Sequence, residues 1–496
     1  MFVAVTASVY AVVLLLGHLH HEMWRDELHC WALGRHATGL WDMLTGDRRY
    51  DGHPFLWYYL LHLVSRLTRS WVALHVVTMV LAIGAAVLWL RYAPIPRALR
   101  VLLLGSYYLL YEYGVMSRSY TLGLALLFTF CALYHPRRIR YVPSAVVLGL
   151  MSATSMYGTI MALALAFFLF SQGPGRHGAP AADGRQRFVF PADWIAGLIV
   201  LTLGLLLTAL TTWPPADAIY HPGPPRPVTA ATVQNALLNY WMGMFPFGDL
   251  VSWNWPGGDY LFSRWRSIDP YVPWLGAGWL LAWLVALRRS PRLAMTYGLG
   301  VLLMAAAQHT IYPGGWRHLV HYFIFMVACL WLYARQTRTR APDRLLQTLL
   351  VLNLAVQIPT GVVAFLTDWR QVFSRSAEAA LFIRQHHLQD QPVVADPDDP
   401  VTPIAAILDR PFFFPVSDDT TDATVFHGGR HPPTPEQVVG HAQRLAAAAG
   451  GSSLILVNYF LGPSRPDGPT VTLLYNAAPG IMNDESCNLY QVTLPR

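Results

Sequence analysis

Long apolar runs separated by short polar loops dominate the chain. A helix needs about 20 residues to cross ~30 Å of hydrocarbon. Eleven runs have roughly that size, and they lie at residues 2–19, 71–90, 98–113, 119–134, 142–157, 158–171, 192–212, 272–287, 293–312, 319–334 and 345–366. The pattern predicts a polytopic α-helical membrane protein, and the composition agrees, since 54% of the residues are hydrophobic and only 13% are charged.

The segment 53–67 (HPFLWYYLLHLVSRL) is a further apolar stretch, but it is short for a crossing. As a helix its apolar part covers only about 20 Å, and it carries His62 and Arg66. We expect an amphipathic helix that lies in the outer membrane interface, with its tryptophan and tyrosines at headgroup depth. A crossing here would move the arginine-rich loops to the opposite side of the membrane.

Arginine positions set the expected orientation. The chain has 35 arginines and no lysine, and its net charge is +7. The total charge says little about partners, but the positions of the arginines along the chain are informative. With eleven crossings, sixteen arginines fall on one side, in the loops 91–100, 135–141, 172–191, 288–292 and 335–344. Because short cytoplasmic loops collect Lys and Arg, this side is expected to be the cytoplasm. Nearly every carboxylate of residues 1–366 falls on the outer side.

Two outer segments differ from the rest in composition. Residues 213–271 begin proline-rich and contain Trp241, Trp253, Trp255 and Trp265, which predicts packing on the bilayer surface, with stacking on sugar rings as the alternative. Residues 367–496 alternate helix-like stretches (SAEAALFIRQHH, PEQVVGHAQRLAAAA) with strand-like ones (PVVAD, SLILVNYF). They predict a small extracytoplasmic α/β domain after a transmembrane domain at residues 1–366.

The stretch HHEMWRDELHCW, residues 20–31, places a dense group of charges on the outer side, directly after the first apolar run. On a helix Asp26 and Glu27 diverge by about 100°, so one carboxylate is able to face a substrate while the other faces the protein. Helix capping by Asp26 and ordinary solvation of both side chains are the alternatives.

Three outer motifs, taken in order, resemble the GT-C membrane glycosyltransferases. The likeness is to the bacterial branch related to protein O-mannosyltransferases and the lipid A aminoarabinose transferase. WRDELHCWALGR (24–35) followed by YDGHPFLWYYLL (50–61) resembles that branch's first outer loop, with its Asp-Glu pair and His-Pro segment. YEYGVMSRSYTLGLALLF (111–128) and GGWRHLVHYFIF (314–325) resemble two later loops. The likeness covers the membrane part, and the tail brings no motif.

The resemblance implies a GT-C fold with juxtamembrane helices in the first outer loop, located in a bacterial cytoplasmic membrane. It also implies an inverting transfer of a sugar from a polyprenyl-phosphate donor to a hydroxyl of an acceptor glycan, lipid or protein. Asp26 matches the catalytic aspartate, and Glu27 is its acidic neighbour. An acceptor hydroxyl needs a carboxylate base. The leaving phosphate needs a guanidinium, for which Arg317, Arg118 and Arg25 are the candidates, in that order.

Further residues of these loops are assigned to donor binding by the resemblance, each with a structural alternative. For Glu112 and Arg118 the alternative is that they are charged residues at a helix end in the membrane interface, without a role in donor binding. Tyr120 belongs to the polar surroundings of Arg118, and His318 with Arg317 suits anchoring to headgroup phosphates. His53, with Pro54, suits the start of the interfacial helix.

Metal dependence is left open, because some members of the family use a divalent cation and others need none. His20, His21 and Glu22 are the candidate ligands, although their spacing is not that of a known metal motif. No other cofactor is expected. The expected partners are the lipid-linked donor, the acceptor and membrane lipids, without nucleic acid.

A transporter or flippase for lipid-linked sugars is the alternative function. Such proteins place ionisable residues near the middle of the membrane and often contain inverted repeats. Here Asp and Glu avoid the centres of the apolar runs and gather in the outer loops. This distribution favours chemistry at the membrane surface.

Overall fold

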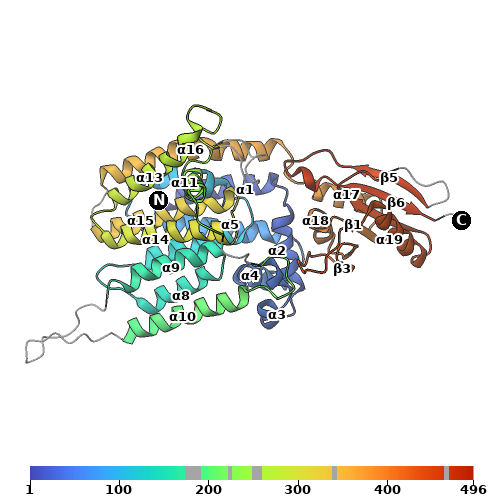
Figure 1. Ribbon diagram of the computed structural model, residues 1–496, viewed down its shortest axis with the longest axis horizontal. Helices are drawn as coiled ribbons and strands as arrows, with labels where there is room; N and C mark the ends of the chain where they lie inside the picture. The colour runs from blue at the N-terminus through green and yellow to red at the C-terminus, as the bar shows by residue number, and fades with distance from the viewer. Residues whose placement is uncertain (174–191, 222–225, 248–259, 338–342, 463–468, 495–496) are drawn as a thin grey trace, which may run out of the picture.

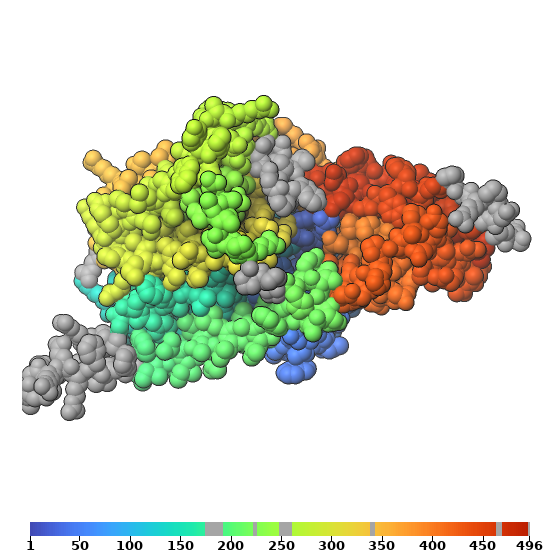
Figure 2. All heavy atoms as spheres, viewed as in Figure 1, coloured from blue at the N-terminus to red at the C-terminus, as the bar shows by residue number. Residues whose placement is uncertain are grey.

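The computed structural model describes residues 1–173, 192–221, 226–247, 260–337, 343–462 and 469–494. It consists of a helical body and a C-terminal domain built on one sheet (Figure 1). Most long helices of the body run roughly along the longest axis of the molecule, and the C-terminal domain lies at one end of that axis (Figure 1). The space-filling view shows this domain seated against the body (Figure 2).

The body is mostly helical, as expected for a membrane protein. Among the described residues, five helices are long and apolar enough to cross a membrane, namely α1 (Phe2–His20), α5 (Ala73–Tyr92), α10 (Ala192–Thr212), α15 (Trp316–Thr337) and α16 (Arg344–Arg370). The other helices found in the predicted apolar runs are α7 (Ser119–Leu133), α8 (Tyr141–Ser152), α9 (Met156–Phe170), α13 (Val272–Ala286) and α14 (Pro291–Thr310).

The single helix expected at residues 98–113 is instead two segments. The helix α6 (Arg97–Leu104) ends before Gly105, and a π-helical turn η2 (Tyr108–Glu112) follows. At the break the Ser106 hydroxyl donates to the carbonyl of Leu103 at 2.7 Å. The helix α16 approaches here so closely that a Cβ at Gly361 would lie 2.9 Å from the backbone of Tyr107. The break therefore fits a close crossing of two backbones.

The helix α15 forms the centre of the body. Of its most apolar 18-residue window, 94% is buried inside the protein. It contacts α7, α9, α14 and α11 (Ala230–Met244). Because other helices surround α15, its apolar residues pack against protein rather than facing the lipid expected around a membrane span.

The helix α11 lies within the segment 213–271, which begins proline-rich, and it was not expected from the sequence. Its start is capped by Thr229, and its buried residues include Tyr240 and Trp241. Trp241 is 6% exposed and donates its indole N–H to the carbonyl of Leu261 at 3.2 Å, whereas Trp265 is 58% exposed. Trp253 and Trp255 lie outside the described residues. The surface position predicted for these tryptophans is therefore wrong for Trp241.

Three short helices and a 3-10 turn connect α1 to α5. They are α2 (Arg25–His36), α3 (Leu40–Thr45), η1 (Asp47–Asp51) and α4 (Leu56–Ser65). The helix expected at residues 53–67 is thus present as α4, although it starts at Leu56 rather than at Pro54. Trp57 and Tyr58 are buried, and α4 packs against α2. These two aromatic side chains are therefore packed inside the protein, and their position at headgroup depth stays a prediction.

The C-terminal domain combines helices with a six-stranded sheet, as the sequence predicts in outline. Its helices are α17 (Ser376–Gln385), α18 (Asp398–Leu408) and α19 (Pro435–Ala448). Its strands are β1 (Val393–Asp396), β2 (Phe412–Phe414), β3 (Asp419–Thr421), β4 (Ser452–Val457), β5 (Thr470–Asn476) and β6 (Asn488–Thr493). The strand order is β3-β2-β1-β4-β6-β5, with β1 parallel to β2 and β4 and the other pairs antiparallel.

Contacts between helix ends show which groups share an end of the body. The guanidinium groups of Arg97 and Arg100 lie over the ring of Phe2, at the start of α1. Arg335, near the end of α15, donates to the carbonyls of Tyr92 and Tyr134 at the ends of α5 and α7. These arginines therefore share one end. The opposite end carries α2 and adjoins the C-terminal domain (Figure 1).

Candidate functional site

Asp26 lies between two arginines that are far away in the sequence. It is the second residue of α2, whereas Arg118 directly precedes α7 and Arg317 is the second residue of α15. Nη1 of Arg118 lies 2.8 Å from Oδ2 of Asp26, and Nη2 of Arg317 lies 2.9 Å from the same oxygen. The structure thus brings together the predicted base and the first two candidate phosphate ligands.

The surroundings of Asp26 keep its carboxylate ionised. Burial alone would raise the pKa of Asp26, but the charges of Arg317 and Arg118 outweigh it and lower the pKa below its usual value. The side chain remains 22% exposed, so a substrate is able to reach it. An ionised and accessible carboxylate meets the first requirement of a general base, although the two arginines weaken its basicity.

Arg317 has hydrogen-bonding capacity that the protein does not use. Within the described residues, its Nε and Nη1 atoms are buried and have no hydrogen-bond partner. Its guanidinium lies over the indole ring of Trp24, 5.0 Å from the ring centre, and Trp24 is fully buried. The ring fixes the plane of the guanidinium. Two nitrogen atoms of Arg317, with three N–H donors between them, are therefore left for an additional acceptor, such as a phosphate oxygen.

Glu27 faces the protein interior, unlike Asp26. Its carboxylate accepts hydrogen bonds from the backbone N–H of Ser117 at 2.5 Å and of Trp24 at 3.2 Å, and it contacts Nε2 of His21 at 3.0 Å. The side chain is fully buried. Burial would raise the pKa of Glu27, but His21 and these hydrogen bonds lower it. Glu27 thus joins the start of α2 to the residue preceding Arg118, which suits positioning rather than contact with a substrate.

The three candidate metal ligands do not converge. His21 contacts the carboxylates of Asp368 and Glu27 with its two ring nitrogens, at 2.8 and 3.0 Å. Burial opposes the charged imidazolium, but both carboxylates together raise the pKa of His21 well above its usual value. His20 stacks on Trp369, and Glu22 accepts a hydrogen bond from the backbone of Phe373. The three side chains thus have different partners, and the described residues contain no group of three His, Cys, Asp or Glu side chains placed to hold a metal ion.

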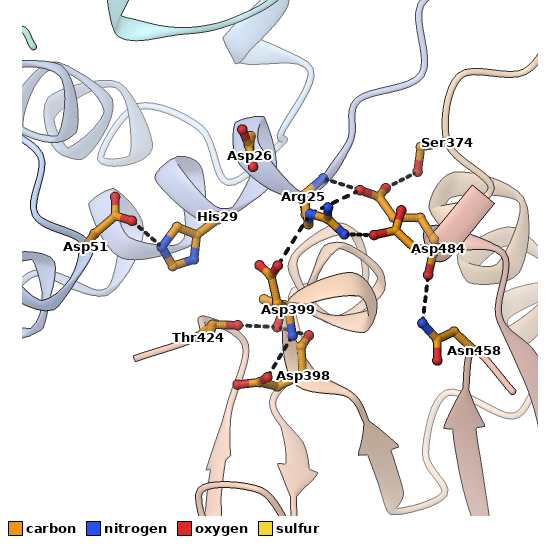
Figure 3. A network of polar contacts seen from close by, with 12 residues as sticks. Arg25, Asp26, His29, Asp51, Ser374, Asp398, Asp399, Thr424, Asn458 and Asp484 are labelled. Atoms are coloured by element: carbon orange, nitrogen blue, oxygen red, sulfur yellow. Dashed lines mark hydrogen bonds and ion pairs between the residues drawn. The ribbon is translucent and has the colours of Figure 1, made fainter. Parts of the chain in front are cut away.

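Arg25 points away from Asp26 and into the C-terminal domain (Figure 3). Its Nη1 pairs with Asp484, its Nε lies 3.4 Å from Asp399, and its backbone N–H donates to Glu485 at 3.1 Å. Glu485 is buried and also accepts a hydrogen bond from the Ser374 hydroxyl at 2.6 Å. Arg25 is therefore engaged by carboxylates of the C-terminal domain, although its guanidinium carbon also lies 5.8 Å from the ring centre of Trp24, the ring that Arg317 covers.

Two residues near Asp26 were not among the sequence candidates. His29 lies one turn after Asp26 on α2, and its Nε2 is 3.6 Å from the carboxylate of Asp51 (Figure 3). Asp51 also accepts a hydrogen bond from the hydroxyl of Tyr58. Burial would lower the pKa of His29, but Asp51 raises it. The spacing of Asp26 and His29 on one helix was the available signal.

The remaining candidates surround the two arginines. The ring of Tyr120 lies beneath Arg118, 5.8 Å from the guanidinium carbon, and its centre is 5.9 Å from that of the His318 ring. Nδ1 of His318 accepts the backbone N–H of Gly315 at 2.9 Å, so His318 also fixes the start of α15. Glu112 accepts a hydrogen bond from the Tyr107 hydroxyl at 2.6 Å.

His53 lies close enough to Asp26 and Arg118 for their charges to change its pKa. Burial lowers its pKa, Arg118 lowers it further, and Asp51 and Asp26 act in the opposite direction. Its backbone carbonyl accepts a hydrogen bond from Arg48. A neutral imidazole beside an arginine pair is able to hydrogen-bond a substrate without adding charge.

No family model matches the chain, and no curated protein matches its sequence. The resemblance to GT-C glycosyltransferases therefore rests on the three sequence motifs.

Proposed function

We propose that the protein is a GT-C-type integral membrane glycosyltransferase. It transfers a sugar from a polyprenyl-phosphate donor to an acceptor hydroxyl, with inversion at the anomeric carbon. The observation that carries this proposal is the contact of Asp26 with both Arg118 and Arg317, at 2.8 and 2.9 Å. Three separate motifs contribute one residue each to this contact, and each residue has the chemistry that the reaction requires.

The proposal includes eleven membrane crossings, in a bacterial cytoplasmic membrane. The arginine-rich end of the body faces the cytoplasm, and Asp26 and the C-terminal domain lie outside. Support comes from the sorting of charged groups, because Arg97, Arg100 and Arg335 share the end opposite to Asp26. A donor with a lipid tail is compatible with a site at a helix end, since the tail stays in the bilayer while the sugar reaches the carboxylate.

Each step of the transfer has a residue to perform it. Asp26 accepts the proton of the acceptor hydroxyl as the oxygen attacks the anomeric carbon. The bond from that carbon to the phosphate oxygen breaks, and the lipid phosphate leaves with the bonding electrons. Arg317 and Arg118 stabilise the charge that develops on the phosphate.

Donor binding also prepares Asp26 for its role. Without donor, both guanidinium groups contact one oxygen of Asp26 and lower its pKa. A phosphate competes for these arginines, beginning with the unpartnered Nε and Nη1 of Arg317. As the arginines turn to the phosphate, the pKa of Asp26 rises and the carboxylate becomes a stronger base. The base is thus activated only when a donor is present.

The test uses purified protein and a synthetic polyprenyl-phosphate sugar labelled in the sugar. Wild type should release or transfer the label, whereas Asp26→Asn should lose at least a hundredfold in turnover, as expected for removal of a general base. Asp47→Asn is the matched control, because Asp47 is an exposed carboxylate of the same outer loop. Donor binding without loss of the label by wild type would favour a flippase, and unchanged turnover of Asp26→Asn would exclude Asp26 as the base.

A further inference from the structure

A groove of about 760 Å³ opens at the end of the body away from the C-terminal domain. It lies between the start of α1, the end of α5 and the start of α6. Its apolar wall includes Val3, Ala7 and Val87, and its polar lining consists of Arg91, Arg97 and Arg100. None of its lining residues is a carboxylate. The groove therefore combines a hydrocarbon surface with a concentrated positive charge.

Two of the three arginines contact residues that line this groove, and none of the three is neutralised by a carboxylate in the described part of the chain. The guanidinium carbons of Arg97 and Arg100 lie 5.2 and 5.3 Å from the ring centre of Phe2, and Arg100 also donates to the carbonyl of Leu90. In the described part of the chain, none of the three forms an ion pair with a carboxylate. At the other end, Arg118 and Arg317 both pair with Asp26. The groove thus retains charge for an external anion.

We propose that this groove binds an anionic phospholipid. Planar guanidinium groups bind phosphate through paired hydrogen bonds, so Arg91, Arg97 and Arg100 would hold the headgroup phosphate. One acyl chain of the lipid would cover the apolar wall of the groove. Free phosphate has no apolar part and would leave this wall exposed. Basic grooves between membrane helices are suited to anionic headgroups. This inference does not rest on sugar transfer, because the groove and Asp26 lie at opposite ends of the body.

The test measures lipid binding to the full-length protein in detergent by native mass spectrometry. The probes are phosphatidylglycerol and phosphatidylcholine with identical acyl chains. Wild type should prefer phosphatidylglycerol, and Arg91→Gln/Arg97→Gln should weaken that binding by about fivefold for each arginine removed. The matched control is Arg288→Gln/Arg292→Gln, which removes two exposed arginines that do not line the groove.

The expected outcome is a loss of affinity in the groove variant alone, with melting temperatures unchanged in both variants. Equal binding of the two lipids by wild type would overturn the proposal. An equal loss in both arginine pairs would also overturn it, since it would indicate a general charge effect. Glycerol phosphate should compete only weakly. Displacement of the lipid by equimolar glycerol phosphate would show that the apolar wall contributes nothing and that the site is for a soluble anion.

Discussion

Arg25 and Asp26 are neighbours in the chain, but their side chains contact different parts of the molecule. The guanidinium of Arg25 pairs with Asp484 of the C-terminal domain, whereas the carboxylate of Asp26 contacts arginines of the helical body. The divergence follows from the helix, because consecutive residues of α2 point about 100° apart. The first turn of α2 therefore connects the C-terminal domain to the candidate base.

Arg317 should determine donor affinity. Replacing it with alanine removes a charge-assisted contact to phosphate, so the apparent donor KM should rise about tenfold to a hundredfold while the acceptor KM changes little. Initial-rate kinetics with each substrate varied in turn will measure both. The exposed Arg266→Ala is the control. An unchanged donor KM would remove Arg317 from phosphate binding.

Glu27 should affect the stability of the protein and the position of the start of α2, rather than the chemical step itself. In Glu27→Gln one of the two carboxylates that pair with buried His21 is lost, which should cost about 3 kcal/mol of unfolding free energy. Thermal unfolding monitored by fluorescence will show this as a lower melting temperature. Turnover per folded molecule should fall far less than in Asp26→Asn. A variant with wild-type stability and no activity would instead support a direct catalytic role for Glu27.

Glu485 should make the stability of the C-terminal domain depend on pH. Burial raises its pKa to about 8, although the Ser374 hydroxyl and Arg25 oppose this. Between the usual glutamate pKa and pH 8 the unfolded chain has lost the proton that the folded protein retains. Stability should therefore fall as pH rises, by up to about 1.4 kcal/mol per pH unit.

Melting temperatures of wild type and Glu485→Gln between pH 5 and pH 9 will test this expectation. The glutamine keeps an acceptor for Ser374 but does not titrate, so its curve should be flatter and lie above that of wild type at high pH. Parallel curves would mean that another group causes the dependence.

Arg25 should couple the C-terminal domain to the site. If its role is to hold that domain, Arg25→Gln and Asp484→Asn should give the same phenotype, namely faster hydrogen exchange in α18 and a similar loss of turnover. The double variant should be little worse than either single one, because both remove one contact. A rise in donor KM confined to Arg25→Gln would indicate that Arg25 binds phosphate after all.

The sequence predicted the helical body more accurately than its interruptions. Residues 192–212 form one helix with the predicted bounds. A long apolar run that crosses lipid has to be helical, because only a helix satisfies the backbone N–H and C=O groups within the segment itself. The break after Leu104 was missed, since the close backbone contact at this point involves Gly361, which is far away in the sequence. The helix α11 was missed because Asn235 and Asn239 interrupt its apolar pattern.

The sequence could predict the part of the site that depends only on which side of the membrane each loop is placed. Counting arginines placed the loops of Asp26, Arg118 and Arg317 on one side, and the structure brings these three residues into contact. The partners of Arg25 could not be predicted, because Asp399, Asp484 and Glu485 belong to no motif and are assembled by the fold of the C-terminal domain. The divergence of Asp26 and Glu27 was predicted from helix geometry, but the partners of Glu27, His21 and the backbone of Ser117, were not.

The buried helix α15 carries Arg317 in its first turn and Arg335 in its last, about 27 Å apart along the axis. Inserting one residue anywhere between them would rotate one guanidinium by about 100° relative to the other. Since both ends are anchored, Arg317 to Asp26 and Arg335 to the carbonyls of Tyr92 and Tyr134, the length of this helix is fixed to the residue. The number of residues in α15 thus couples the direction of the Arg317 side chain at one end of the body to that of Arg335 at the other end.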